Sequence, residues 1–149
     1  MADVTDARLP LSAALLRYVE RRAATMTAAR QLLGITEIDA RTLLHVHANP
    51  GIRPTQLREY LGITSAGVTA LADRLITREL LRREPDPEDR RVNHLFVDID
   101  LDGEPWSALT AFDDTLDREL RARLDSDTGG FADVLTAASD AASRALSPA

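Results

Sequence analysis

The segment from Ile63 to Gly103 constrains the fold more than any other part of the chain. Its first half predicts a helix to about Leu80, because apolar residues recur at spacings of three and four: Val68, Leu71, Ala72 and Leu75. Its second half predicts a hairpin with a strand over 81–84, a proline-rich tip, and a return strand of alternating Leu95, Val97 and Ile99. A slender helix beside a hairpin tipped with arginines is the shape of a winged helix-turn-helix.

Three helices are predicted before this segment. The first covers residues 10–33 and carries an apolar stripe that must be buried on something. The second opens with Thr36 and Asp39, which resemble a capping box, and ends at the turn over 49–51. The third is a short helix from Pro54, and its predicted inner face consists of Leu57, Tyr60 and Leu61.

Two more helices are predicted after the hairpin, over about 105–124 and 131–146. Gly129 and Gly130 are expected to separate them. The predicted fold class is therefore mainly α with a small β-hairpin wing, and the first and last helices lie outside the winged helix-turn-helix.

The composition narrows the class further. The chain has 149 residues, of which 44% are hydrophobic and 28% charged, as in ordinary globular proteins. It has no cysteine, no apolar run near the ~20 residues of a membrane span and no signal-peptide pattern, so we expect a cytoplasmic protein. The net charge of −6 arises in residues 92–149, which carry twelve acidic residues and four arginines. The predicted winged segment is thus not acidic overall.

Several residues of the segment 36–99 occur together in a specific arrangement: Leu57, Leu61-Gly62, Val68-Thr69, Leu71, Asp73-Arg74-Leu75, Leu80, Arg83 and Asp89-Arg90-Arg91. An Asp-Arg-Arg hairpin tip at this distance from an Asp-Arg-Leu helix is more specific than either piece alone. In these residues the chain resembles the MarR family of bacterial transcription regulators, and the resemblance extends over nearly its whole length.

The resemblance implies an obligate homodimer with interlocking terminal helices. Residues 1–35 would form an N-terminal dimerisation helix, 36–100 the winged helix-turn-helix, and 101–149 the C-terminal dimerisation helices. It further implies a repressor that binds a palindromic operator in double-stranded DNA and is released by a small, often aromatic, ligand, with no cofactor. The alternative is a winged-helix protein-interaction module, or anti-regulator, that no longer binds DNA.

Two features depart from the family pattern. The family usually has glycine after the second helix of the motif, where this chain has Glu79. A non-glycine residue in the left-handed conformation costs ~1 kcal/mol or more, so this helix end is expected to be built differently. The return strand is also expected to run about two residues longer before Gly103.

DNA binding needs phosphate contacts for register and base-edge contacts for sequence. Thr55 and Gln56 fall in the first turn of the short helix, where free N–H groups favour a phosphate; their alternative role is helix capping. Arg74 corresponds to a phosphate contact of the family, or else pairs with Asp73 or Glu79. Small residues are predicted to face the bases: Thr64, Ser65, Ala66, Thr69 and Ala70. Such side chains discriminate bases weakly, so DNA shape is expected to carry much of the specificity.

The hairpin tip carries the strongest DNA-binding prediction. Arg90 and Arg91 place guanidinium groups where a narrow, negative minor groove would take them, and Arg91 is the residue expected to insert. Asp89 is expected to orient the neighbouring guanidinium by a charge-assisted hydrogen bond. The alternative is a local salt bridge of these arginines with Asp86 or Glu88.

In the family, a ligand pocket lies between the dimerisation helices and the winged module. Its predicted lining here is Tyr18, Leu44, His45, His47, Trp106 and Phe112. An aromatic ring beside a histidine would stack on and hydrogen-bond a phenolate. The alternative is that these residues only fill the junction.

The sequence favours neither a metal site nor catalysis. Residues 98–103 spell D-x-D-x-D-G, but position twelve of this calcium-loop pattern is Leu109 in place of glutamate, so Asp100 or Asp102 is expected to cap the next helix. His45 and His47 would face different sides of a helix, and no metal site is predicted. The sequence shows no nucleophile motif, phosphate loop or carboxylate pair, so we expect no enzyme.

Overall fold

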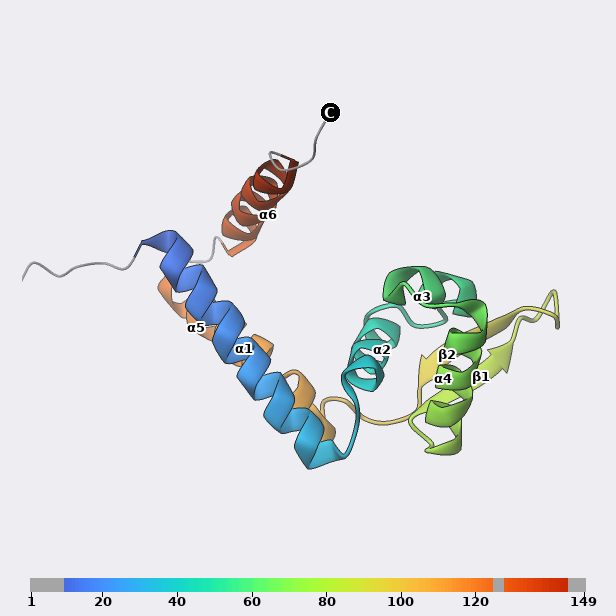
Figure 1. Ribbon diagram of the computed structural model, residues 1–149. Helices are drawn as coiled ribbons and strands as arrows, with labels where there is room; N and C mark the ends of the chain where they lie inside the picture. Colours follow the sequence, from blue (N-terminus) through green and yellow to red (C-terminus); the bar gives the residue numbers. More distant parts are fainter. Residues whose placement is uncertain (1–9, 125–127, 145–149) are drawn as a thin grey trace, which may run out of the picture. The chain divides into compact units, whose positions relative to one another are not determined.

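The computed structural model describes residues 10–124 and 128–144, which divide into two compact units after Thr110 (Figure 1). The first unit contains α1 (Leu11–Leu33), α2 (Glu37–Ala48), α3 (Pro54–Leu61), α4 (Ser65–Thr77), β1 (Leu81–Pro85), β2 (Asn93–Val97) and the 3-10 helix η1 (Trp106–Leu109). The second unit contains α5 (Ala111–Arg123) and α6 (Thr128–Arg144). The predicted fold class, mainly helical with one small antiparallel hairpin, is confirmed.

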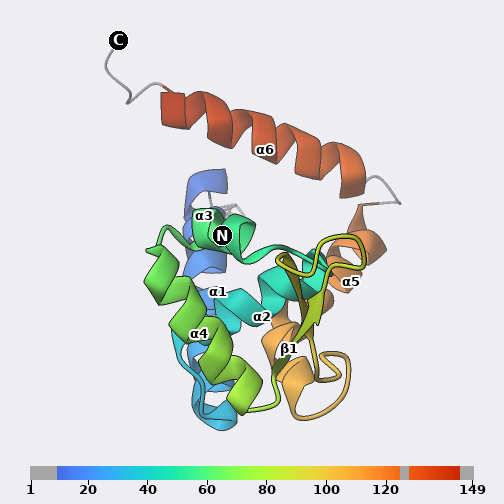
Figure 2. The same ribbon diagram turned by 90° about the vertical axis from the view of Figure 1, so that its right-hand side faces the viewer.

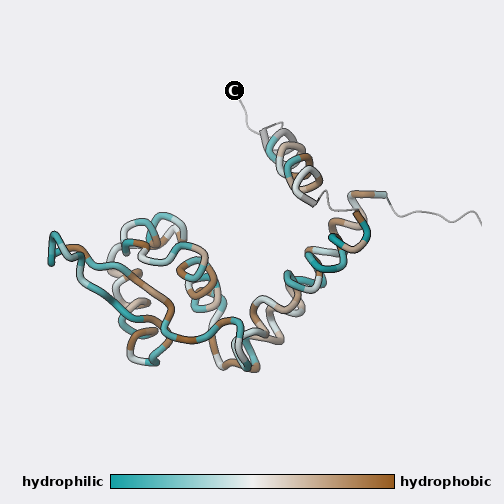
Figure 3. The backbone as a smooth tube through the Cα atoms, turned by 180° about the vertical axis from the view of Figure 1, so that it is seen from behind, coloured by the Kyte–Doolittle hydropathy of each residue, from teal (hydrophilic) through white to brown (hydrophobic). Residues whose placement is uncertain are grey.

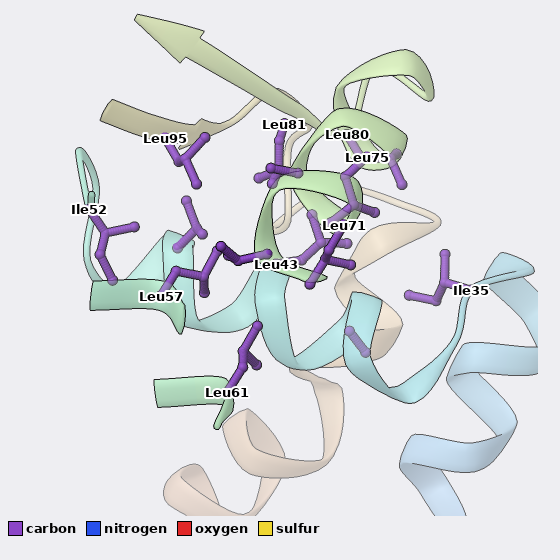
Figure 4. Close-up of a cluster of buried hydrophobic side chains, with 14 of the residues drawn as sticks. Ile35, Leu43, Ile52, Leu57, Leu61, Leu71, Leu75, Leu80, Leu81 and Leu95 are labelled. Carbon is purple, nitrogen blue, oxygen red and sulfur yellow. The ribbon is translucent and has the colours of Figure 1, made fainter. Parts of the chain in front are cut away.

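Helices α2, α3 and α4 gather against the hairpin (Figures 1 and 2). Each contributes leucines to one core, shown in Figure 4: Leu43 from α2, Leu57 from α3, Leu75 from α4 and Leu95 from β2 are all fully buried. Full burial of one such side chain contributes roughly 1.5–3 kcal/mol. This shared core fixes α4 and the hairpin relative to each other.

The hairpin is short and its far end is mostly hydrophilic (Figure 3). Its strands pair from Leu81 opposite Val97 to Pro85 opposite Asn93, and Leu95 also pairs with Ile52 in the loop before α3. The return strand ends at Val97, so the predicted extension through Ile99 is wrong. One further bond follows the strand, because the amide of Asp98 donates to the carbonyl of Leu80 at 3.0 Å.

Helix α2 begins with the predicted capping box. The backbone amide of Thr36 donates to Asp39 Oδ2 at 3.0 Å, and the amide of Asp39 donates to the Thr36 hydroxyl at 3.3 Å. Helix α4 begins after Thr64, whose hydroxyl accepts the amide of Gly67 at 3.1 Å. Thr64 is therefore the N-cap of this helix.

The end of α4 differs from its prediction. Glu79 adopts the left-handed conformation with φ 57°. The expectation of a differently built helix end is therefore wrong, because a glutamate occupies the position that favours glycine. The amide of Leu80 donates to the carbonyl of Leu75, and that of Glu79 donates to the carbonyl of Ile76, both at 2.9 Å. Burial of Leu80 against the core holds this turn in place and offsets the strain at Glu79.

Replacement of Glu79 by glycine is expected to raise the free energy of unfolding by about 1 kcal/mol, because the steric cost of the left-handed conformation disappears. Urea unfolding followed by circular dichroism measures it. Gly34→Ala is the matched control: Gly34 has φ 61° and open space around a Cβ, so its replacement should cost a similar amount. A glycine variant less stable than the parent chain would contradict this account.

Three local predictions are wrong. Tyr60 is 45% exposed, because its ring stacks on His45 outside the core. The expected helix over 105–124 is interrupted, since the amide and the hydroxyl of Thr110 both donate to the carbonyl of Ser107 and close η1 before α5 begins. Asp100 accepts the amide of Asp102 at 3.0 Å and η1 follows Pro105, so neither aspartate caps it.

The prediction that Gly129 and Gly130 separate two helices is also wrong, because both lie in the first turn of α6. The first amides of a helix have no partner within it, so this turn depends less on regular backbone bonding than the interior does. Leu146, at the predicted end of the last helix, lies outside the described residues. The three-part division into 1–35, 36–100 and 101–149 concerns a dimer and stays a prediction.

Candidate nucleic-acid interface

Helices α3 and α4 form a helix-turn-helix joined by Gly62, Ile63 and Thr64. Gly62 takes φ 66° at the end of α3, and Arg58 reaches across the turn to donate to the Ser65 hydroxyl at 3.2 Å. This bond ties α3 to the first residue of α4. Arg58 also lies 3.6 Å from Glu59, so it is engaged within the motif.

The start of α4 presents the small residues that the sequence predicts as base-facing. All five are exposed: Thr64, Ser65, Ala66, Thr69 and Ala70. The Thr69 hydroxyl donates to the carbonyl of Ser65 at 3.0 Å, which leaves its oxygen as an acceptor. The opposite face of α4 is buried in the core. A helix with so little side-chain bulk on its outer face can approach a groove closely.

The two predicted phosphate contacts on α3 differ in what they do. Gln56 Oε1 accepts the backbone amide of Arg53 at 3.0 Å, so Gln56 has the capping role that was its alternative. Thr55 is exposed in the first turn of α3. A phosphate contact by either residue stays a prediction.

Arg74 has a partner that the sequence did not indicate. Its guanidinium pairs with the carboxylate of Asp39, 35 residues earlier, and with neither Asp73 nor Glu79. The Asp39 side chain is only 2% exposed, whereas that of Arg74 is 50% exposed. Burial alone would raise the pKa of Asp39, but hydrogen bonds from Thr36 and Arg74 outweigh it and hold this pKa below 3.8. The pair joins the start of α2 to α4, and a phosphate contact by Arg74 stays a prediction.

The wing tip is ordered by two carboxylates bonded to backbone amides. Asp86 Oδ1 accepts the amides of Glu88 at 2.9 Å and Asp89 at 3.2 Å. Asp89 Oδ1 accepts the amide of Arg91 at 3.0 Å, so Asp89 shapes the backbone instead of orienting a guanidinium as expected. Arg90 and Arg91 are exposed, and within residues 10–124 and 128–144 neither guanidinium has an ion-pair partner. Their alternative salt bridges with Asp86 or Glu88 are thus not formed.

The wing is fastened to the core by His94, which the sequence analysis did not single out as functional. Its Nδ1 lies 2.6 Å from the carbonyl of Gly51, in the loop between α2 and α3. Its Nε2 lies 2.9 Å from Asp86 Oδ2. The bond to His94 and those from the wing amides lower the pKa of Asp86 to about 2, and the bonds to Asp86 and Gly51 raise the pKa of His94.

The predicted ligand-pocket residues come from both compact units and have different local surroundings. The His45 ring stacks on Tyr60 with 3.6 Å between centroids, and Arg41 lies 5.5 Å from the same ring. His47 is exposed, while Leu44 and Trp106 pack partly buried against the core. Tyr18 belongs to the first unit and Phe112 to the second. An open apolar cavity of about 500 Å³ is instead lined by Leu124, Gly130, Phe131 and Val134. The pocket therefore stays a prediction.

Over the described ranges, no three His, Asp or Glu side chains are grouped as ligands of a metal ion. None of the helices that the structure describes is both long and apolar enough to cross a membrane.

The helix-turn-helix of α3 and α4, followed by a hairpin with exposed arginines, defines a winged helix-turn-helix protein. Residues 33–92, from the end of α1 to the far side of the wing tip, match the model of the MarR family. A comparison with curated proteins finds no match.

Solved structures share the fold at low sequence identity. A point mutant of S. aureus MepR bound to an oligodeoxyribonucleotide is 18% identical, with a TM-score of 0.59 over 89% of this chain and 99% of that one. A transcriptional regulator from Thermotoga maritima is 24% identical, with a TM-score of 0.55 over 91% and 96%. The Multiple Antibiotic Resistance Repressor MarR is 19% identical, with a TM-score of 0.56 over 91% and 99%.

The predicted resemblance is confirmed: this winged-helix chain is similar to the MarR family of transcription regulators. Members of that family are regulators and not enzymes, in agreement with the absence of a catalytic motif in the sequence.

Proposed function

We propose that the protein is a homodimeric, sequence-specific DNA-binding repressor that a small, possibly aromatic, ligand releases from a palindromic operator. The observation that carries the DNA-binding part concerns Arg90 and Arg91, on a wing that shares its core with α4. Their guanidinium groups are exposed and have no ion-pair partner among the residues that the structure describes. A fold neighbour, the MepR mutant, is bound to an oligodeoxyribonucleotide. On this proposal α4 lies in the major groove and Arg91 enters the adjacent minor groove.

The experiment that tests this proposal is selection of bound sites from random duplex DNA at two salt concentrations. An enriched palindrome with half-sites about one helical turn apart is the expected result, because two copies of α4 must reach successive major grooves. Binding should weaken steeply with salt, since each neutralised phosphate releases counterions. No enrichment at low salt would favour the alternative, a winged-helix protein-interaction module or anti-regulator that no longer binds DNA.

Exposed apolar residues support the homodimer. In the single chain, Leu16 and Val19 are 60% and 57% exposed on α1, and Phe131 and Val134 are 40% and 68% exposed on α6. Large apolar surfaces of this kind are usually covered by a partner. The proposed dimer-forming regions are therefore residues 1–35 and 101–149, which contain α1, α5 and α6.

Sedimentation equilibrium of the full chain should give twice the 16.3 kDa of one chain. The double variant Leu16→Glu and Val19→Glu should sediment as a monomer or unfold, because it would place two charges in the interface. Ala14→Glu, which adds one charge at an exposed position of the same helix, is the control and should remain dimeric. A monomeric parent chain at micromolar concentration would refute the dimer.

The last part of the proposal concerns the ligand. The predicted lining remains Tyr18, Leu44, His45, His47, Trp106 and Phe112, with an aromatic acid or phenol as the expected class. A thermal-shift screen with aromatic acids should find at least one that raises Tm and weakens operator binding. A compound that raises Tm without changing operator affinity would be a ligand but not an effector.

A further inference from the structure

A continuous series of hydrogen bonds runs from the core of the winged module to its tip. The Gly51 amide donates to the carbonyl of Leu95 at 3.0 Å, and the amide of Leu95 donates to the carbonyl of Ile52 at 2.9 Å. This pairing holds the loop between α2 and α3 against β2. Next to it, His94 bonds the carbonyl of Gly51 on one side and Asp86 on the other.

Asp86 continues this series of hydrogen bonds to the wing tip. Its second oxygen accepts the amides of Glu88 and Asp89, and its own amide donates to the carbonyl of Val92 at 2.9 Å. Asp89 in turn accepts the amide of Arg91. The backbone of both arginines is therefore connected, through Asp86 and His94, to a loop of the core. We call His94, Asp86 and the Gly51 carbonyl the wing clamp.

The wing clamp requires a doubly protonated imidazole. A carbonyl oxygen and a carboxylate oxygen both accept hydrogen bonds and donate none, so both ring nitrogens of His94 must donate. Only the imidazolium form does this, and a neutral ring leaves one nitrogen lone pair facing an oxygen. The His94 side chain is 22% exposed and that of Asp86 is 20% exposed, so water reaches the pair only in part.

The charged groups around His94 have opposite effects on its protonation. Asp86 at the wing tip stabilises the imidazolium, and the positive charge of Arg53, just before α3, opposes it. On the neighbouring strand Glu84 is the register partner of His94, but its carboxylate bonds Arg82 at 2.9 Å. The dominant neighbour is therefore the carboxylate of Asp86.

We propose that His94 is a positioning residue for DNA binding: its imidazolium holds the wing tip in the geometry that presents Arg91, so that operator affinity depends on pH through the wing clamp. This rests on the proposed DNA-binding function and adds a means of regulation to it. The wing clamp responds to protonation of His94, and it affects DNA binding through the position of Arg91.

The sign follows from the direction of the pKa. The bonds in the folded protein raise the pKa of His94 above its ordinary value of 6.5, so the clamp is complete below that value and opens as the pH rises through the raised pKa. The pKa of Asp86 lies near 2, so its carboxylate stays charged through this range. Operator binding should therefore tighten between pH 8 and pH 6.

The test measures operator affinity by fluorescence anisotropy at constant ionic strength, at pH 6 and pH 8. His94→Gln should weaken binding severalfold at pH 6 and much less at pH 8, which flattens the pH profile. Asp86→Asn should flatten it as well, because an amide group donates to a neutral imidazole and no longer selects the imidazolium. Glu84→Gln removes the carboxylate of the register partner of His94, which bonds Arg82 outside the clamp, and should leave the pH profile unchanged.

A double-mutant cycle separates positioning from general stability. If His94 acts through Arg91, the variant with both His94→Gln and Arg91→Ala should bind no more weakly than Arg91→Ala alone. A profile for His94→Gln that matches the parent protein, or effects of the two substitutions that multiply, would overturn the proposal while leaving the DNA-binding function intact.

A measurement that needs no DNA separates failure of the wing clamp from failure of the proposed function. The ring of His94 and the amides of Glu88 and Asp89 should titrate together in NMR spectra of the parent protein, and these amide shifts should vanish in Asp86→Asn. If the protein binds no DNA but this titration occurs, the clamp exists and its role in operator binding is overturned together with the proposed function. If DNA binds and the amides do not follow His94, only the clamp is wrong.

Discussion

Replacing Asp39 by asparagine is expected to lower the free energy of unfolding by about 2–3 kcal/mol, near the lower end of the cost of removing one partner from a buried ion pair. The Asp39 carboxylate is almost completely buried, and its two oxygens serve Thr36 and Arg74 separately. An asparagine keeps one acceptor and turns an amide group toward the other donor. The half-exposed guanidinium of Arg74 regains some hydration, which is why the loss should not reach the upper end.

Urea unfolding at fixed protein concentration measures this loss, because the stability of the proposed dimer would depend on concentration. Asp73→Asn is the matched control. Its carboxylate also bonds an arginine, Arg83, at 2.9 Å, but it is 57% exposed, so its loss should cost under about 1 kcal/mol. Equal effects of the two substitutions would show that burial of the Asp39 pair adds nothing.

The same carboxylate gives a pH dependence of known sign. Because the pKa of Asp39 lies below 3.8 in the folded protein, its stabilisation is fully present above that value and disappears as the pH falls toward the folded pKa. The difference in unfolding free energy between the parent chain and Asp39→Asn should therefore shrink in acid. A difference that stays constant from pH 6 to pH 3 would contradict this assignment.

Replacing Arg91 by alanine is expected to weaken operator binding about tenfold or more, from the loss of a minor-groove guanidinium, and to reduce the salt slope by about one. The affinity should fall on all operator variants alike, since the groove is read by shape and charge. Anisotropy titrations at several salt concentrations measure both quantities.

Arg121→Ala is the control for Arg91. Arg121 is an arginine of α5, 68% exposed, outside the winged module, so its removal should leave operator affinity and salt slope nearly unchanged. A normal salt slope for Arg91→Ala would remove Arg91 from the DNA interface, and a large effect of Arg121→Ala would move the interface to α5.

Features set by neighbouring residues were predictable from the sequence. The capping box of Thr36 and Asp39 needs only two residues three apart, and the buried face of α4 needs only its own apolar spacing. The resemblance to the MarR family rests on such local motifs, which is why the order of elements and the wing were predicted correctly.

Features that depend on contacts distant in sequence were not predictable. The second bond of Asp39 goes to a residue 35 positions later, and His94 meets a carbonyl 43 positions earlier. Tyr60 has the spacing of a core residue, yet the ring of His45 offers it a partner outside the core. Periodicity indicates on which face of a helix a side chain lies, but it does not indicate which residues that side chain contacts.

The left-handed Glu79 has a mechanical consequence. It lies at the joint between α4 and β1, the two elements proposed to contact successive grooves of DNA. Leu75 before this joint and Leu80 and Leu81 after it are buried in one core, so the joint transmits the position of α4 to the wing. A duplex whose groove spacing departs from the one that this joint sets should therefore be bound more weakly, so that the joint selects operators by their shape.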